Sequence, residues 1–244
     1  MAQTEQELRV QLAACYRIFD HMGWSEMIYN HITAKVPGPE HHFLINPYGL
    51  HYREVTASNL VKVDIDGNIV EHTDYAVNPA GLVIHTAIHA ARPDIQCIAH
   101  THTNAGMAVA CTQEGLRTDN FYSALLHNQI AYHDFEGITV NDEEKPRLIA
   151  NLGDKSLMIL RNHGLLAGGR TIPEAFQNLW AMERACQVQV TTDSTGRPNI
   201  PVGPEILAKS EQLMAMQAMG GPSGELEFKA LTRLIEKIDP SYKD

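Results

Sequence analysis

The sequence predicts an α/β fold of three layers, in which a mixed, largely antiparallel sheet carries helices on both faces. Within the first seventy residues, one amphipathic helix is followed by short apolar stretches joined by tight turns, the pattern of an antiparallel meander. From residue 79 onward, helical patterns alternate with short apolar runs, so the later strands need helices packed over them. With 244 residues, we expect a single domain, 1–244, that ends in a helical tail from about residue 204.

The N-terminal helix is predicted from its cap and its spacing. Thr4 and Glu7 form a capping box, apolar residues then recur along one face, and Gly23 is placed to end the helix. Turn signals separate the strands that follow, and Asp66-Gly67 is the best hairpin signal among them. These strands are predicted at 29–36, 43–46, 60–64 and 68–70.

Caps and apolar runs also define the remaining elements. Pro79 suits the first turn of a helix, and Thr171 with Glu174 forms a second capping box. The predicted helices cover 79–91, 104–111, 141–153, 171–191, 204–219 and 225–238. Strands are predicted at 95–102, 156–161 and 164–167, and 120–137 is predicted to be a loop with a short strand.

Composition excludes several classes of partner. The net charge of −10 disfavours nucleic acid and anionic membranes as partners. No apolar run approaches the roughly twenty residues of a membrane-spanning helix, and the N-terminus lacks the pattern of a signal peptide. The four cysteines are scattered among apolar neighbours without a CxxC pair, so we expect reduced thiols and a cytoplasmic location.

Two histidines mark the candidate site. His100 and His102 end an apolar strand, and side chains at i and i+2 of a strand point to the same face. Two such imidazoles can bind a divalent metal if a third ligand folds back to them, and His163, after the apolar run 157–160, is the best candidate. A His-x-His pair alone is a weak signal, because two active-site histidines without a metal give the same pattern.

The neighbouring residues strengthen the metal interpretation. Arg92-Pro93-Asp94, His100-Thr101-His102 and Asn162-His163-Gly164-Leu165 resemble the class II aldolase/adducin family, and the resemblance covers roughly residues 5–190. It implies that His100, His102 and His163 bind a catalytic divalent ion, with Zn²⁺ preferred and Mn or Fe as alternatives. It also implies a homotetramer with its metal sites near the subunit interfaces.

The resemblance leaves the substrate open. In the sugar-phosphate aldolases of the family, a Glu lies four residues before a helix histidine that aligns with His85, but this chain has Gly81 there and Asn78-Pro79-Ala80 in place of the serines before it. The loop at 24–29 contains no glycine and offers few backbone N–H groups to a phosphate. We therefore expect a non-phosphorylated substrate. The predicted substrate-binding residues are Tyr29, Asn30, Asn46, Gly49, Ala80 and Gly81.

The proton donor is the least determined part of the site. Tyr132 and His133 lie in the region that resembles a mobile tyrosine loop, which in the family reaches a neighbouring subunit's metal, and His31 follows the pocket residue Asn30. We predict a catalytic role for Tyr132, His133 or His31, the alternative being hydrogen-bonded residues without a role. His85 and His89 are interpreted as one packed helix face.

Three neutral histidines with an open fourth position are typical of a catalytic metal rather than a structural one. Such an ion stabilises the enolate that forms when a carbon–carbon bond breaks. The predicted function is a divalent-metal-dependent lyase, of decarboxylase or aldolase type, acting on a hydroxy-carbonyl or aromatic hydroxy-carboxylate substrate. The alternatives are an Fe(II)-dependent oxygenase-decarboxylase, a sugar-phosphate aldolase and a non-enzymatic adducin-like scaffold.

Overall fold

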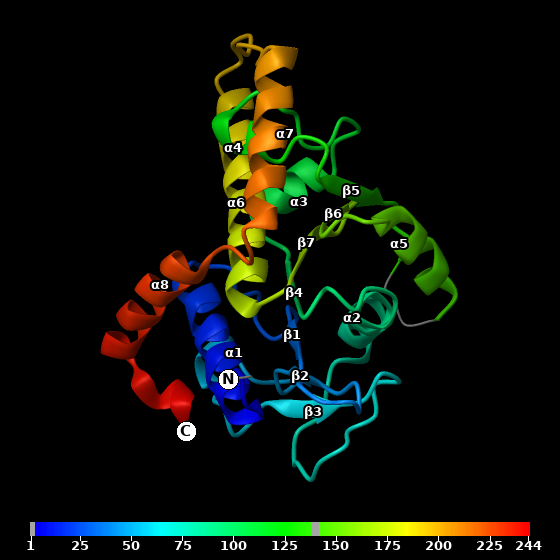
Figure 1. The fold of residues 1–244 in the computed structure, drawn as a ribbon, viewed down its shortest axis with the longest axis vertical. Helices are drawn as coiled ribbons and strands as arrows, with labels where there is room; N and C mark the ends of the chain where they lie inside the picture. Colours follow the sequence, from blue (N-terminus) through cyan, green and yellow to red (C-terminus); the bar gives the residue numbers. More distant parts are fainter. Residues whose placement is uncertain (1–2, 138–141) are drawn as a thin grey trace.

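A seven-stranded sheet forms the centre of the protein in the computed structural model, which describes residues 3–137 and 142–244 (Figure 1). The strand order is β3-β2-β1-β4-β7-β6-β5, and only β5 and β6 pair in parallel. The strands are β1 Ile32–Lys35, β2 Phe43–Ile45, β3 Val61–Val63, β4 Cys97–Thr101, β5 Ile130–His133, β6 Leu157–Leu160 and β7 Gly164–Gly169. The predicted mixed, largely antiparallel sheet is confirmed.

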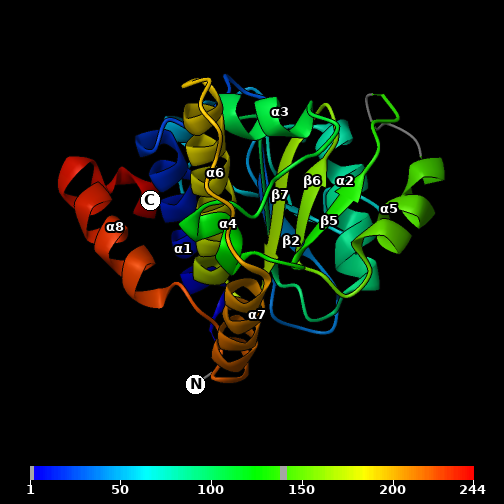
Figure 2. The ribbon, with the colours of Figure 1, turned by 90° about the horizontal axis from the view of Figure 1, so that it is seen from above.

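Helices cover both faces of the sheet, so the predicted three layers are confirmed as well (Figure 2). The α-helices are α1 Glu5–His21, α2 Pro79–Ala91, α3 Asn104–Ala110, α4 Phe121–Leu125, α5 Lys145–Leu152, α6 Ile172–Asp193, α7 Pro204–Met219 and α8 Glu225–Ile238. Helices α1, α3, α6 and α8 share one hydrophobic core with the sheet, whereas α2 and α5 pack on its opposite face. Within the described residues, 3-10 helices lie at Tyr52–Glu54, Asp142–Glu144 and Pro240–Lys243.

Local signals in the sequence explain many of these boundaries. The capping box of Thr4 and Glu7 is formed, and α2, α7 and α8 have the predicted bounds. Gly153 follows the last residue of α5 as expected. The predicted cap Asn141 lies outside the described residues.

Two expectations were wrong in detail. The strand expected at 68–70 is reduced to a single bridge between Val63 and Ile69, because the Asp64 side chain accepts hydrogen bonds from the backbone N–H groups of residues 66 and 68. The stretch 120–137 contains the short helix α4, which begins at a capping box formed by Asn120 and Ser123. Because both members of the box lie within one helical turn, it is a local signal for the start of α4.

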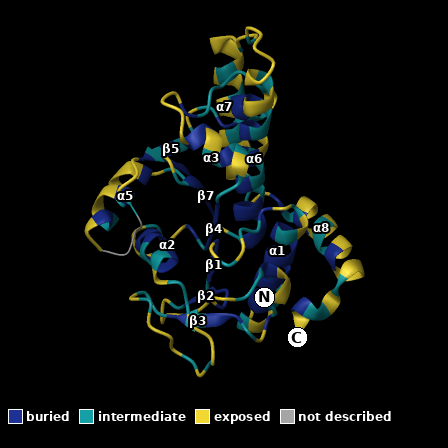
Figure 3. Ribbon diagram, turned by 180° about the vertical axis from the view of Figure 1, so that it is seen from behind, coloured by how far each residue is buried: buried dark blue, intermediate teal, exposed yellow. Residues whose placement is uncertain are grey.

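The C-terminal helices differ in how they are held. Helix α8 packs on α1 and α6 and contributes the buried Phe228, and Arg17 of α1 pairs with Asp239 at 2.7 Å. Helix α7 packs against α4 and has no buried residue (Figure 3). Of the two helices beyond residue 204, only α8 therefore contributes side chains to the core.

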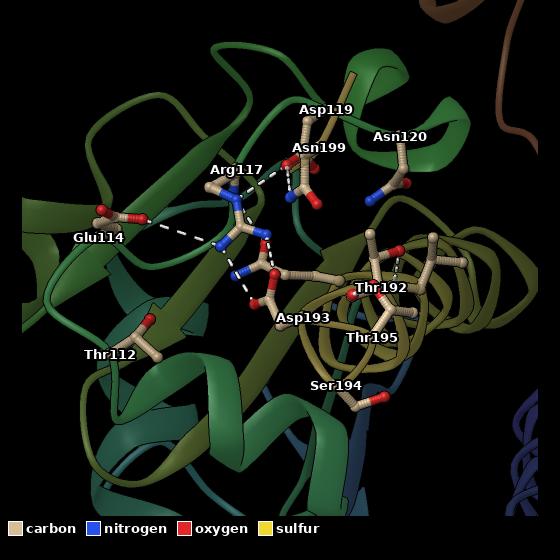
Figure 4. Close-up of polar contacts among 12 residues, drawn as sticks. Thr112, Glu114, Arg117, Asp119, Asn120, Thr192, Asp193, Ser194, Thr195 and Asn199 are labelled. Atoms are coloured by element: carbon tan, nitrogen blue, oxygen red, sulfur yellow. Dashed lines mark hydrogen bonds and ion pairs between the residues drawn. The ribbon is translucent and has the colours of Figure 1, made fainter. Parts of the chain in front are cut away.

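Arg117 ties the loop after α3 to the end of α6. Its guanidinium group contacts Asp193 at 2.5 Å and Asp119 at 2.9 Å, and Asn199 donates to the same Asp119 carboxylate (Figure 4). The carboxyl groups hold the pKa of Arg117 above its ordinary value. The cluster fixes the loop that enters α4.

Candidate metal centre

The three predicted ligands meet at one end of the central strands. One ring nitrogen from each of His100, His102 and His163 lies within 4.8 Å of the other two. His100 is on β4, and His102 follows the last residue of that strand. His163 lies in the tight turn between the antiparallel strands β6 and β7.

The turn between β6 and β7 explains why an Asn-His-Gly sequence is needed there. Asn162 adopts a left-handed backbone conformation, with φ of 57°, that asparagine tolerates better than most residues. Gly164 packs so closely against β4 that a Cβ atom on it would overlap the Thr101 carbonyl oxygen and lie 3.2 Å from the His102 ring. The missing side chain lets β7 bring His163 to the two histidines of β4.

In both His100 and His102, a hydrogen bond at Nδ1 turns the Nε2 atom into the site. His100 Nδ1 donates to the Leu165 carbonyl oxygen at 2.8 Å, and His102 Nδ1 faces the Glu26 carboxylate at 2.6 Å. In neutral rings both Nε2 atoms then carry lone pairs, and these atoms are only 2.8 Å apart. Two lone pairs at this distance repel unless a cation lies between them, so the donor set fits a divalent metal.

Burial keeps His100 and His163 in the neutral form that metal binding requires. Burial, reinforced by His163, His102 and His31, lowers the pKa of His100 well below its usual range. Burial and the neighbouring His102 lower the pKa of His163 to about 4.

The ligands line a cavity of about 380 Å³. Among the predicted site residues, Tyr29, His31, Ala80 and Gly81 also line it. Its apolar walls come from Tyr29, Ile84, Met107 and Phe135, and the Phe135 ring lies 6.2 Å from the His163 ring. No Lys or Arg is among the described residues of its wall, and Glu26 is the one carboxylate there.

A second cavity of about 480 Å³ shares Glu26 and His102 with the first and contains the predicted residue Asn30. The Asn30 side chain donates to the Trp24 carbonyl oxygen, and its Oδ1 atom is buried without a hydrogen-bond partner in the part of the chain that the structure describes. Glu26 and Glu183 supply two carboxylates, and no Lys or Arg belongs to the described lining. A phosphate group would meet negative charge in this cavity.

Four other predicted site residues are not brought to either cavity in this chain. The Tyr132 hydroxyl accepts a hydrogen bond from Leu116 N–H, and Arg161 lies over its ring. His133 is buried between Glu144 and Asn151. Asn46 is bound by the Tyr16 hydroxyl, and Gly49 lies in an exposed turn. A role for Tyr132 or His133 at the metal therefore requires a neighbouring subunit, and it stays a prediction.

Glu26, His85, Asn162 and Phe135 also line the metal cavity, although the sequence did not predict them as site residues. Glu26 is followed by Met27, which adopts φ of 46°, a left-handed conformation that is rare for such a side chain. This backbone turn brings the Glu26 carboxylate to His102. No periodicity in the sequence encodes that approach.

Glu26 should tune the affinity of the site for metal. A carboxylate that accepts from the second nitrogen of a ligand histidine orients the ring, and its loss typically weakens metal binding by about 10–100-fold. We expect Glu26→Gln to raise the dissociation constant for Zn²⁺ within that range. Calorimetric titration of metal-free protein measures it, with the exposed Glu40→Gln as control. Equal affinities in the two variants would contradict the assignment.

Acid should destabilise the metal-free protein. Burial lowers the pKa of His31 to about 4 and that of His89 to about 3, from 6.5. As pH falls below 6.5, the unfolded chain binds protons that the folded protein does not, so stability is lost towards pH 4. At pH 5, His31 and His89 should each lower the free energy of unfolding by about 2 kcal/mol relative to neutral pH.

Urea unfolding at pH 7 and pH 5, in the presence of a chelator, measures this loss. The exposed His72→Gln variant should show the same difference between the two pH values as the original protein. A free energy of unfolding that does not change between pH 7 and pH 5 would refute the expectation.

Fold and site together define a class: an α/β protein with a three-histidine centre in a cavity at the end of its central strands. The sequence profile described as "Class II Aldolase and Adducin N-terminal domain" matches residues 10–190. The chain belongs to the class II aldolase and adducin family. The family predicted from the sequence is thus confirmed.

Proteins named as class II aldolases and proteins named as adducins are both similar to this chain. A Caulobacter vibrioides protein with a provisional aldolase class 2 name is 45% identical over 245 residues, covering 100% of this chain and 95% of that protein. Rat alpha-adducin is also 45% identical, over 96% of this chain but only 34% of its own length.

Solved structures of class II aldolases are also similar to this chain. An aldolase II superfamily protein from Pseudomonas syringae has a TM-score of 0.94 and 47% identity, covering 100% of this chain and 98% of that one. An L-fuculose 1-phosphate aldolase from Glaciozyma antarctica has a TM-score of 0.85 and 29% identity, covering 98% and 93%. In the part of the chain that the structure describes, no helix is long and apolar enough to cross a membrane.

Proposed function

We propose that this protein is a divalent-metal-dependent carbon–carbon lyase, of decarboxylase or aldolase type, for a non-phosphorylated hydroxy-carbonyl or aromatic hydroxy-carboxylate substrate. The observation that carries the proposal is the set of three histidines, of which His100 and His163 have lowered pKa values, in a cavity whose described wall contains no Lys or Arg. Family membership supports a lyase-type reaction. Zn²⁺ is the proposed ion, with Mn or Fe as alternatives.

Each group in the cavity has a defined part in this proposal. His100, His102 and His163 would hold the ion, which acts as a Lewis acid on the oxygen atoms of a chelated substrate. Glu26 orients His102. Tyr29 and Phe135 provide flat apolar walls that suit a planar substrate better than a sugar. His31 also borders the ligands, and its ring lies 5.6 Å from that of His100.

The sugar-phosphate alternative rests on the likeness to the L-fuculose 1-phosphate aldolase from Glaciozyma antarctica described above. Two observations weigh against it. The His31 ring fills the space into which a side chain at Gly81 would extend, since a Cβ atom there would lie 2.6 Å from the ring. The neighbouring cavity presents two carboxylates where a phosphate would need cations.

The scaffold alternative rests on the identity to alpha-adducin. An interaction module gains nothing from neutral histidines that converge on a cavity, so a retained metal centre favours the enzyme. The oxygenase-decarboxylase alternative uses the same three ligands, and iron would distinguish it from the lyase, because Zn²⁺ has no redox chemistry.

The proposal is tested by metal analysis and turnover together. Protein purified without added metal should contain zinc near one equivalent per chain, and iron would favour the oxygenase instead. The zinc-loaded protein should cleave members of a panel of 2-hydroxy-ketones and ortho-hydroxybenzoates. Turnover of L-fuculose 1-phosphate within the usual enzymatic range, about 1–10³ per second, would overturn the choice of substrate class. Absence of bound metal would overturn the lyase.

We also propose that the protein is a cytoplasmic homotetramer with metal sites near the subunit interfaces. Support comes from the exposed side chains of Phe121 and Phe135, which are 71% and 52% accessible in the single chain. Phe135 lines the metal cavity, so a subunit that covers it would help to close the site. Light scattering that finds an active monomer would refute this assembly.

A further inference from the structure

A chain of hydrogen bonds runs beneath the metal cavity from β1 to α2. The Thr33 hydroxyl lies 2.8 Å from His85 Nδ1 and 2.8 Å from His89 Nε2, and His89 Nδ1 lies 3.3 Å from the Ile95 carbonyl oxygen. His85 and His89 are one helical turn apart on α2, and the two imidazoles share one hydroxyl. All three side chains are buried.

The direction of each hydrogen bond in this chain is determined by chemistry. A carbonyl oxygen can only accept, so His89 carries its proton on Nδ1 and has a lone pair on Nε2. The single hydroxyl proton of Thr33 must then point to His89, and the Thr33 oxygen accepts from His85 Nδ1–H. The Nε2 atom of His85 then carries a lone pair, and unlike Nε2 of His89 it accepts no hydrogen bond from a described residue.

Both rings are neutral, which this assignment requires. Burial lowers the pKa of His89 to about 3 and that of His85 well below its usual range. A doubly protonated ring would have no lone pair to offer the Thr33 hydroxyl. The tautomers of His85 and His89 are therefore coupled through Thr33.

The Nε2 atom of His85 is one of three buried nitrogen atoms in the wall of the metal cavity that lack a hydrogen-bond partner among the described residues. His85 lines the metal cavity, and its Nε2 atom is buried without a hydrogen-bond partner among the described residues. Next to it, 4.2 Å away between ring centres, is His31, whose two nitrogens are also buried and make no well-formed hydrogen bond to a described residue, although the backbone of Tyr29 and of Gly81 lies nearby. A buried polar atom left unpaired costs about 1–3 kcal/mol, so three in one wall indicate a missing partner.

The sequence makes room for this pair of rings. His31 and Thr33 alternate along the chain at β1, so both face α2. Gly81, one turn before His85 on α2, leaves the space that the His31 ring fills, since a Cβ atom there would lie 2.6 Å from it. The His31 ring also lies 5.6 Å from that of the ligand His100, so the pair borders the metal position.

We propose that His31 and His85 form a subsite for a substrate hydroxyl group beside the metal ligands, and that Thr33 and His89 position His85 as its acceptor. The inference deepens the proposed function and rests on it. A neutral His31 offers one donor and one acceptor, and His85 offers one acceptor. A hydroxyl group matches this set because it donates to His85 Nε2 and accepts from the His31 N–H. A carboxylate or phosphate oxygen has no proton to donate and would face a lone pair.

A hydroxyl subsite restricts the hydroxy-carbonyl and hydroxy-carboxylate substrates of the proposed function to those with one further hydroxyl group. The molecule carries a hydroxyl group on a carbon next to the atoms that chelate the metal. Substrates that lack this hydroxyl leave His85 Nε2 unpaired and should bind more weakly.

Two small chelators test the subsite. Lactate and glycerate both present a 2-hydroxycarboxylate to a metal, but only glycerate has a further hydroxyl group on the adjacent carbon. Calorimetric titration of the zinc-loaded protein should find glycerate bound about tenfold more tightly than lactate, the contribution of one good hydrogen bond. Equal affinities would overturn the inference.

Two substitutions at Thr33 test whether its hydroxyl positions His85. Thr33→Val removes the hydroxyl that fixes the His85 tautomer and should reduce the preference for glycerate to about one, while Thr33→Ser keeps the hydroxyl and the preference. Lactate affinity should be the same in all three proteins, because lactate reports only on the metal. A preference for glycerate that persists in Thr33→Val would overturn the positioning role.

The tautomer can be tested without any variant. In protein with ¹⁵N-labelled histidine, long-range proton–nitrogen correlation spectra should show His85 and His89 protonated on Nδ1, and a proton on His85 Nε2 would overturn the inference. If zinc-loaded protein binds neither lactate nor glycerate, the proposed metal function fails, and the subsite fails with it. If lactate binds and glycerate gains nothing, only the subsite fails.

Discussion

Replacing His163 with alanine is expected to abolish tight binding of a divalent ion and to leave the fold intact. One nitrogen each from His100, His102 and His163 forms the donor set, so the variant retains two of three ligands. Loss of a residue that only orients a ligand weakens metal binding by about 10–100-fold, so loss of a ligand should exceed about 100-fold. His163 is half-buried in a turn at a strand end, outside the hydrophobic cores.

Elemental analysis and zinc titration measure this effect, and thermal unfolding followed by circular dichroism checks the fold. His100→Ala and His102→Ala should behave in the same way, whereas His72→Ala, which removes an exposed histidine, should keep its metal. Unchanged metal content in all three ligand variants would show that the site is wrongly assigned.

A single methyl group at Gly164 is expected to cost about 3 kcal/mol of stability, at the upper end of overpacking effects. The added Cβ atom would overlap the Thr101 carbonyl oxygen, which belongs to the backbone and cannot rotate away. Strands β4 and β7 would have to separate where they pair Thr101 with Leu165, next to His102. Gly164→Ala should therefore weaken zinc binding as well.

Gly203→Ala is the matched control, since a Cβ atom at Gly203 would meet no atom of the described residues within 4 Å. Urea unfolding of the two variants compares their free energies of unfolding directly. If Gly164→Ala were as stable as Gly203→Ala, the close approach of β4 and β7 would not limit the residue at this position.

Local chemistry made much of the fold predictable. The capping box of Thr4 and Glu7 and the first-turn prolines of α2 and α7 act within one helical turn, so the starts of these helices follow from neighbouring residues. The family match confirms the predicted fold and family. The missed helix α4 also begins at a local signal, the Asn120 capping box, but it is only five residues long and has no clear periodicity.

The sequence alone determined the order of most helices and strands and the candidate ligands His100, His102 and His163, because these depend on caps, on the two-residue repeat of a strand and on motifs. Only the tertiary structure decided which other groups surround them. Glu26 meets His102 across 76 residues of sequence, and Thr33 joins His85 across 52. Such contacts depend on how distant segments pack and on backbone conformations such as that of Met27, which no local pattern encodes.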